Sequence, residues 1–111
     1  MPKSVTLLKG TLDLLLLRTL ALEPLHGAAI AERVLQMTQG AFHVKAGSLF
    51  PGLHRLEHEG WIKGNWDVSK DGRRVKSYRL TRAGRRQLDR EEATWDRLVA
   101  AMNRVPRAAS S

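Results

Sequence analysis

The sequence contains no cysteine, and this absence excludes several kinds of chemistry at once. Without thiols the chain has no disulfide framework, no thiolate metal ligand and no cysteine nucleophile. It also has no glycine-rich phosphate loop, no nucleophile elbow and no HExxH motif. His54 and His58 have a helical spacing that can hold zinc, but no obvious third ligand accompanies them, and we interpret them as surface histidines. We therefore expect no enzyme, no metal and no cofactor.

Long hydrophobic runs are absent as well. The apolar stretch Leu14–Leu17 is far too short to span a bilayer. Charged residues interrupt it on both sides: Lys9, Asp13, Arg18 and Glu23. No targeting segment stands out. We expect a core helix here, no membrane partner and a cytoplasmic location, with which the lack of cysteine agrees.

Basic residues outnumber acidic residues by 19 to 11, and the surplus is concentrated in one segment. Residues 1–60 carry a net charge of +1, and residues 91–111 are neutral. Residues 61–90 contain ten basic and three acidic residues, a net charge of +7. One strongly positive segment indicates a local surface for a polyanion. The alternative is an ordinary solvated charged face.

Apolar spacing predicts four helices. We expect them at residues 7–22, 28–38, 47–59 and about 82–104. The first is apolar nearly all round, which predicts burial on several sides and suggests a partner chain in so small a domain. Pro51 fits best if the third helix begins near Ser48, because amides of the first turn have no intrahelical acceptor. Thr81 is a suitable N-cap for the last helix.

Two strands are predicted at Trp61–Val68 and Val75–Leu80, joined by an Asp71-Gly72 turn. The expected fold is mainly α with a small β-hairpin, namely a winged helix-turn-helix with a long C-terminal dimerisation helix. The corresponding boundaries are a DNA-binding domain at 1–80, the dimerisation helix at 81–105 and a flexible tail at 106–111.

The third helix and the hairpin carry the residues that we expect to bind double-stranded DNA. They are Lys45, Ser48, Phe50, Pro51, His54, Arg55, Lys70, Arg73, Arg74 and Lys76. The helix would read base edges and the hairpin would follow phosphates or enter a minor groove. Arg55 could instead pair with Glu57, Glu59 or Glu32, and the hairpin charges could serve only solubility.

The last helix has a coiled-coil-like apolar spacing. Leu88, Trp95 and Met102 recur every seven residues, and Leu98 and Val105 occupy the intervening heptad position, three residues after Trp95 and Met102. We predict a homodimer that places two DNA-reading heads about 34 Å apart. The residues assigned to it are Leu12, Leu16, Leu88, Trp95, Leu98 and Met102. The alternative is that this stripe packs on its own domain.

Several short segments occur together in a recognisable order. They are His26-Gly27, Gly47-Ser48-Leu49-Phe50-Pro51, Leu53-His54-Arg55-Leu56-Glu57, Gly60-Trp61-Ile62 and Tyr78-Arg79-Leu80-Thr81-Arg82-Ala83-Gly84. In this order they closely resemble the PadR family of bacterial transcriptional regulators, in its short form. The resemblance covers about residues 7–104 and implies repression through inverted-repeat operators, usually relieved by a small molecule or a stress signal.

The resemblance also implies specific residue roles. Ser48, Phe50 and Pro51 fall where the family's recognition helix meets DNA, although the family usually has tyrosine at the position of Phe50. Ala28 likewise replaces a common tyrosine. Some relatives hold flat aromatic ligands between subunits, which makes Trp95 a candidate contact for a small aromatic effector, with a plain dimer-core role as the alternative.

The function predicted from the sequence is a sequence-specific DNA-binding regulator, a repressor that acts as a homodimer on an inverted repeat. Two alternatives stay open: a winged-helix protein–protein adaptor, and a nonspecific nucleic-acid binder. The concentrated positive charge argues against the adaptor, which has no need of it.

Overall fold

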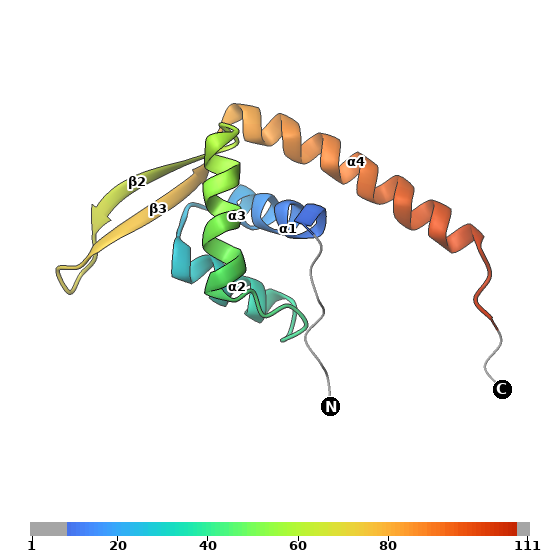
Figure 1. The fold of residues 1–111 in the computed structure, drawn as a ribbon, viewed down its shortest axis with the longest axis horizontal. Coiled ribbons are helices and arrows are strands. Elements are labelled where there is room, and N and C mark those ends of the chain that lie inside the picture. Colours follow the sequence, from blue (N-terminus) through green and yellow to red (C-terminus); the bar gives the residue numbers. More distant parts are fainter. Residues whose placement is uncertain (1–8, 109–111) are drawn as a thin grey trace.

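The computed structural model describes residues 9–108. Its elements follow one another as α1 (Lys9–Leu22), β1 (Leu25–His26), α2 (Gly27–Met37), α3 (Ala46–His58), β2 (Ile62–Val68), β3 (Arg74–Leu80) and α4 (Arg82–Arg104). Figure 1 shows a helical body from which the β2–β3 hairpin and α4 extend on opposite sides. The predicted order of four helices and a hairpin is confirmed. The expected helix start at Leu7 and the end of the predicted tail, residues 109–111, lie outside the described part.

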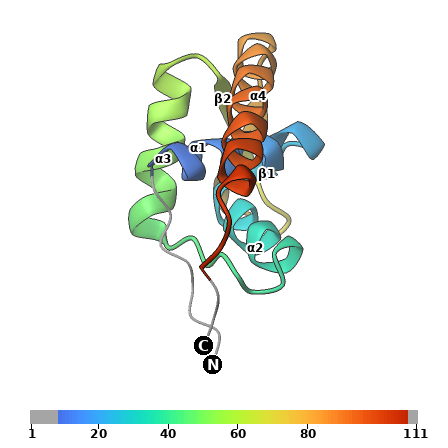
Figure 2. The same cartoon turned by 90° about the vertical axis from the view of Figure 1, so that its right-hand side faces the viewer.

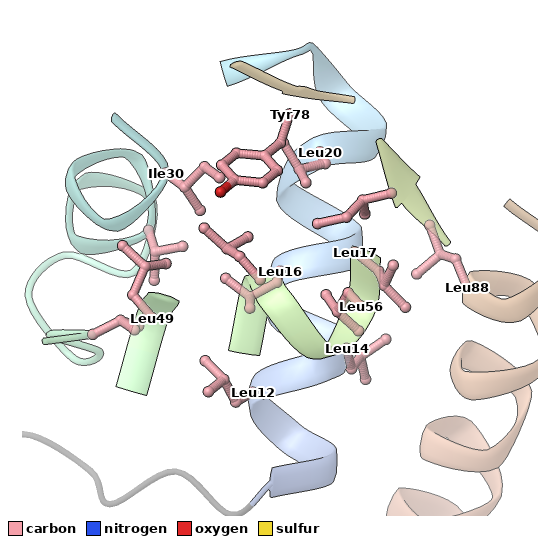
Figure 3. Close-up of a cluster of buried hydrophobic side chains, with 14 residues drawn as sticks. Leu12, Leu14, Leu16, Leu17, Leu20, Ile30, Leu49, Leu56, Tyr78 and Leu88 are labelled. Atoms are coloured by element: carbon pink, nitrogen blue, oxygen red, sulfur yellow. The ribbon is translucent and has the colours of Figure 1, made fainter. Parts of the chain in front are cut away.

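Helix α1 is the centre of the core. It contacts α2, α3, α4 and β3, and five of its seven leucines are buried against them (Figure 3): Leu12, Leu14, Leu16, Leu17 and Leu20. Even its buried hydroxyl is satisfied within the helix, since Thr19 Oγ1 donates to the Leu15 carbonyl at 2.8 Å. Neighbours within one chain therefore cover most of this apolar helix, although Leu22 at its end stays 65% exposed. Its apolar character alone does not require a partner chain, and the partner suggested for α1 stays a prediction.

Helix α3 begins two residues earlier than the position that would suit its proline. Lys45 is the N-cap, and its carbonyl accepts hydrogen bonds from the amides of Ser48 and Leu49 at 2.9 and 2.8 Å. Pro51 consequently lies in the second turn, not the first as predicted. The inward apolar positions are as expected, because Leu49, Leu53 and Leu56 are buried.

The sheet has three antiparallel strands in the order β1-β3-β2, one more strand than predicted. β1 has only two residues, which pair as Leu25 with Tyr78 and His26 with Ser77. Such a short strand leaves no alternating pattern that sequence reading could detect. The predicted turn is present: Gly72 has a φ of +82°, where glycine is favoured.

Helix α4 starts in the body and then leaves it. The Thr81 hydroxyl caps it by accepting the Gly84 amide at 3.0 Å, as predicted. A Cβ at Gly84 would lie 1.9 Å from the Trp61 carbonyl oxygen, so only glycine allows this close approach. Residues 93–104 of the helix are all exposed. Figure 2, which looks along α4, shows it passing in front of α1. Within residues 9–108, no helix has the length and apolarity that crossing a membrane requires.

Candidate nucleic-acid interface

The outer face of α3 offers a row of accessible side chains. Four of the predicted DNA-binding residues are exposed there: Ser48, Phe50, Pro51 and His54. A fifth, Lys45, is exposed just before the helix begins. Their inward neighbours hold the helix on the core, so the outer face can approach another molecule without unfolding. His54 and His58 are both exposed, and the described residues contain no group of three ligands placed to hold a metal.

Phe50 is held in place by a glycine at the start of α2. A Cβ added at Gly27 would lie 2.8 Å from Phe50 Cε1, closer than real contacts allow. The ring therefore packs on the bare backbone of Gly27 while 47% of the residue stays exposed. This contact gives a packing reason for the glycine of the His26-Gly27 segment.

Arg55 does not lie on the outer face of α3. It turns toward α1 and forms an ion pair with Asp13, a buried carboxylate. The prediction of Arg55 as a DNA contact, and its alternative pairing with Glu57, Glu59 or Glu32, are both corrected by this contact. Arg55 instead joins α3 to α1.

The hairpin carries accessible cations close to its turn. Lys70, Arg73 and Arg74 are all exposed, as predicted for a wing. Arg73 has a loose contact with Asp71, with 3.7 Å between Nε and Oδ2. Arg74 lies over the indole of Trp66, with its Cζ 4.8 Å from the ring centroid, a cation–π arrangement.

Lys76 differs from the other wing cations because its charge is compensated. Its Nζ lies 2.9 Å from Glu57 Oε1, and Glu57 Oε2 accepts the Gly64 amide at 3.1 Å. The hydrogen bond from Lys76 lowers the pKa of Glu57, and the same bond raises the pKa of Lys76. The prediction of Lys76 as a cation free to bind DNA is therefore corrected: it braces the hairpin against α3.

A groove of about 680 Å³ lies between α3 and the hairpin. Three aromatic side chains from both sides line it: Phe50, Trp66 and Tyr78. His54 and the Glu57–Lys76 pair complete this part of the lining. Trp66 was missed by sequence reading, although it is 61% exposed. Strand alternation puts Trp66 on the same side of β2 as Gly64, but only the tertiary contact of Gly64 with Glu57 shows that this side faces α3.

The residues assigned to dimerisation divide into two groups. Leu12, Leu16 and Leu88 are buried in the core of this chain and so are not available to a partner, which corrects that part of the prediction. The other three form an exposed stripe on α4: Trp95, Leu98 and Met102. The exposed Val99, and Val105 just after the helix, extend this stripe. The alternative that the whole stripe packs on its own domain holds only for Leu88.

A hollow of about 450 Å³ separates the start of this stripe from α1. Leu14, Trp95 and Leu98 give it apolar walls, and Glu91 adds a carboxylate. Oxygen Oε2 of Glu91 has no hydrogen-bond partner among the described residues. Burial, together with the nearby charge of Asp13, raises the pKa of Glu91.

The fold and sequence are similar to those of known regulators. The structure resembles a transcriptional regulator from Clostridium thermocellum, with a TM-score of 0.82 over 89% of this chain and 96% of that one, at 22% identity. It also resembles a PadR family transcriptional regulator from Eggerthella lenta, with a TM-score of 0.74, 31% identity, and 86% and 81% coverage. These similarities confirm the predicted winged-helix fold.

Sequence comparison agrees with the structural one. The chain is 34% identical to the transcriptional regulator Rv3488 of Mycobacterium tuberculosis over 74 residues, which are 67% of this chain and 65% of that protein. The model of the transcriptional regulator PadR-like family matches residues 16–90, from the middle of α1 into α4. Proteins of this family regulate transcription by binding DNA and are not enzymes. The match spans the core, the reading helix and the wing, and this chain therefore belongs to the PadR-like family of transcriptional regulators.

Proposed function

We propose that this regulator is a homodimeric repressor that binds an inverted-repeat operator. In this proposal, the outer face of α3 enters the major groove with Ser48, Phe50, Pro51 and His54, and Lys45 binds a flanking phosphate. The observation that carries the proposal is the position of the wing cations. Lys70, Arg73 and Arg74 are exposed on the hairpin next to α3, so the same molecule of DNA can meet both.

The homodimer is supported by the exposed stripe of α4. Leu98 is 51% exposed and Met102 is 63% exposed, on a helix segment that extends away from the body. A second copy of the same helix would remove these side chains from water, and a two-fold axis would match the symmetry of an inverted repeat. Such a dimer would bind an inverted repeat more tightly than a monomer, because once one copy is bound the second copy binds the other half-site at a high effective concentration.

A small aromatic effector is a second proposal, carried by the hollow beside Trp95. Its walls are apolar, and an indole face can stack on a flat ring. The hollow adjoins the stripe that we assign to the dimer, so a ligand there would alter how the two copies meet. The test is whether an aromatic compound quenches Trp95 fluorescence and weakens operator binding. A compound series that does neither contradicts the proposal.

The test of the main proposal is fluorescence anisotropy with labelled duplexes from the region upstream of the protein's own gene. A scrambled duplex serves as a control, and each titration is repeated at several salt concentrations. We expect tight binding to the native duplex, with the logarithm of affinity falling steeply against the logarithm of salt concentration. Arg73→Gln should reduce that slope by about 1. Arg104→Gln, which removes an exposed cation from the far end of α4, should leave the slope unchanged.

Two outcomes would decide against the proposal. Equal binding to both duplexes would favour a nonspecific nucleic-acid binder. No binding to either duplex at low salt would favour the protein–protein adaptor. The Arg73 and Arg104 variants make the comparison internal, because both remove one exposed arginine.

A further inference from the structure

Trp66 is the largest exposed apolar side chain on the hairpin. A single exposed apolar residue is ordinary, but Trp66 shares one groove with Phe50, which is also 47% exposed, and grouped apolar surface of this kind marks binding sites. Its own chain does not cover it: 61% of the residue is accessible. It lies instead at the open rim of the groove between α3 and the hairpin, with Phe50 across the groove.

The neighbours of Trp66 make this rim both apolar and positive. Arg74 lies over the ring at 4.8 Å from its centroid, and Lys76 lies 5.8 Å from the same centroid. Because the Arg74 side chain is held on the indole, its guanidinium loses less conformational freedom when it binds an anion. The ring therefore positions a cation while leaving part of its own surface free.

The charge of the groove also suits a polyanion. Glu57 is the one carboxylate among the groove-lining residues, and Lys76 compensates it. Because the pKa of Glu57 is lowered, both side chains of the Glu57–Lys76 pair are ionised at physiological pH, and their opposite charges cancel. Arg74 then leaves the rim with a net positive charge, beside an apolar indole. Deoxyribose and phosphate alternate along a DNA strand and present the same two chemistries.

We propose that the groove between α3 and the hairpin holds one strand of the DNA backbone, with Trp66 packed on a deoxyribose and Arg74 bound to the adjacent phosphate. This inference rests on the proposed DNA binding and adds a contact that supplies affinity without reading bases. Trp66 contributes through apolar contact, and Arg74 contributes through charge. The salt slope distinguishes the two contributions, because replacing Trp66 frees the Arg74 side chain but keeps its charge, and only the charge sets the slope.

The experiment compares Trp66→Ala with Arg74→Gln in the anisotropy assay described above. Trp66→Ala should weaken binding about tenfold, the effect expected from losing about 55 Å² of apolar surface buried on the sugar, and should leave the salt slope unchanged. Arg74→Gln should weaken binding and lower the slope by about 1. Leu22→Ala is the matched control, since Leu22 is 65% exposed and lies outside the groove.

Fluorescence gives a second readout that does not depend on affinity. The native duplex should quench part of the wild-type tryptophan emission, and Trp66→Phe should abolish that part. If the wild type binds DNA but Trp66→Ala binds equally well and no Trp66 quenching occurs, the proposed backbone groove is wrong. If the wild type itself does not bind, the DNA-binding proposal fails first. A thermal unfolding curve for each variant excludes loss of fold as the cause.

Discussion

Helix α1 and the second half of α4 look alike in sequence but have opposite surroundings. Both have apolar residues at helical spacing, and both were assigned to a dimer for that reason. In the fold, α1 is enclosed by three helices and a strand, and Leu16 and Leu17 have no exposed surface. The second half of α4 leaves the body, and Leu98 and Met102 are more than half exposed. Apolar content shows that a helix will be covered, but not by which chain.

The largest expected effect is that of Leu16→Ala in α1. Removing a fully buried leucine loses its transfer free energy and leaves a cavity, so the free energy of unfolding should fall by about 2–5 kcal/mol. Because Leu16 belongs to the core of one chain, the loss should also appear at protein concentrations where only monomer is present. Urea unfolding at two well-separated concentrations measures this. A loss that appears only where the chain is dimeric would place Leu16 at the interface after all.

Leu98→Glu tests the other side of the comparison. A charge on the α4 stripe should weaken the proposed dimer by about 1.5–3 kcal/mol for each protomer, the value of one buried leucine. The fold of each chain should survive, because Leu98 lies outside the core. Sedimentation equilibrium would show the shift from dimer to monomer. Leu22→Glu, at a leucine outside the stripe that is 65% exposed against 51% for Leu98, is the control and should leave the mass unchanged.

The smallest expected effects come from two adjacent glutamates where α1 and α4 meet. A hydrogen bond from Arg18, with 2.7 Å between Nε and Oε2, lowers the pKa of Glu92. The ionised Glu92 therefore stabilises the fold above its ordinary pKa of 4.5, and this contribution is lost as pH falls through its folded value. Burial raises the pKa of Glu91, so its contribution has the opposite sign: it favours the fold at low pH and weakens as pH rises through the raised pKa.

At neutral pH, Glu91→Gln should therefore raise the free energy of unfolding and Glu92→Gln should lower it. Each change should stay within about 1 kcal/mol, because neither residue is fully buried and water screens part of each charge. At a pH where both carboxylates are protonated, the two variants should approach the wild type. Urea unfolding at acid and neutral pH tests the pair, and equal signs at neutral pH would contradict the assigned environments.

The part of the site that could be predicted from sequence is the part specified by neighbours in the chain. Ser48 and His54 are exposed because Leu49 and Leu53 turn inward, which helical spacing predicts. Trp66 needed the pairing of β2 with β3 to place it beside α3 and Arg74. Without that pairing, nothing distinguished it from a tryptophan that packs in the core.

Two cations show the same limit. Arg55 and Lys76 were predicted to bind DNA because their charge and element suited that role. Their partners, Asp13 and Glu57, lie 42 and 19 residues away in the chain and meet them only after folding. An ion pair of this kind leaves no mark on local sequence spacing, so charge counting included both cations in the DNA-binding surface.

By itself the sequence determined the order of the four helices and the hairpin, the Thr81 cap, the turn at Gly72 and the accumulation of positive charge in residues 61–90. These depend on backbone preference and on composition, which act over a few residues. Only the tertiary structure decided that α1 is covered by its own chain, that Lys76 is neutralised and that a groove opens beside Trp66. The physical reason is that burial and ion pairing depend on which distant segments come together, and that is a property of the packed chain.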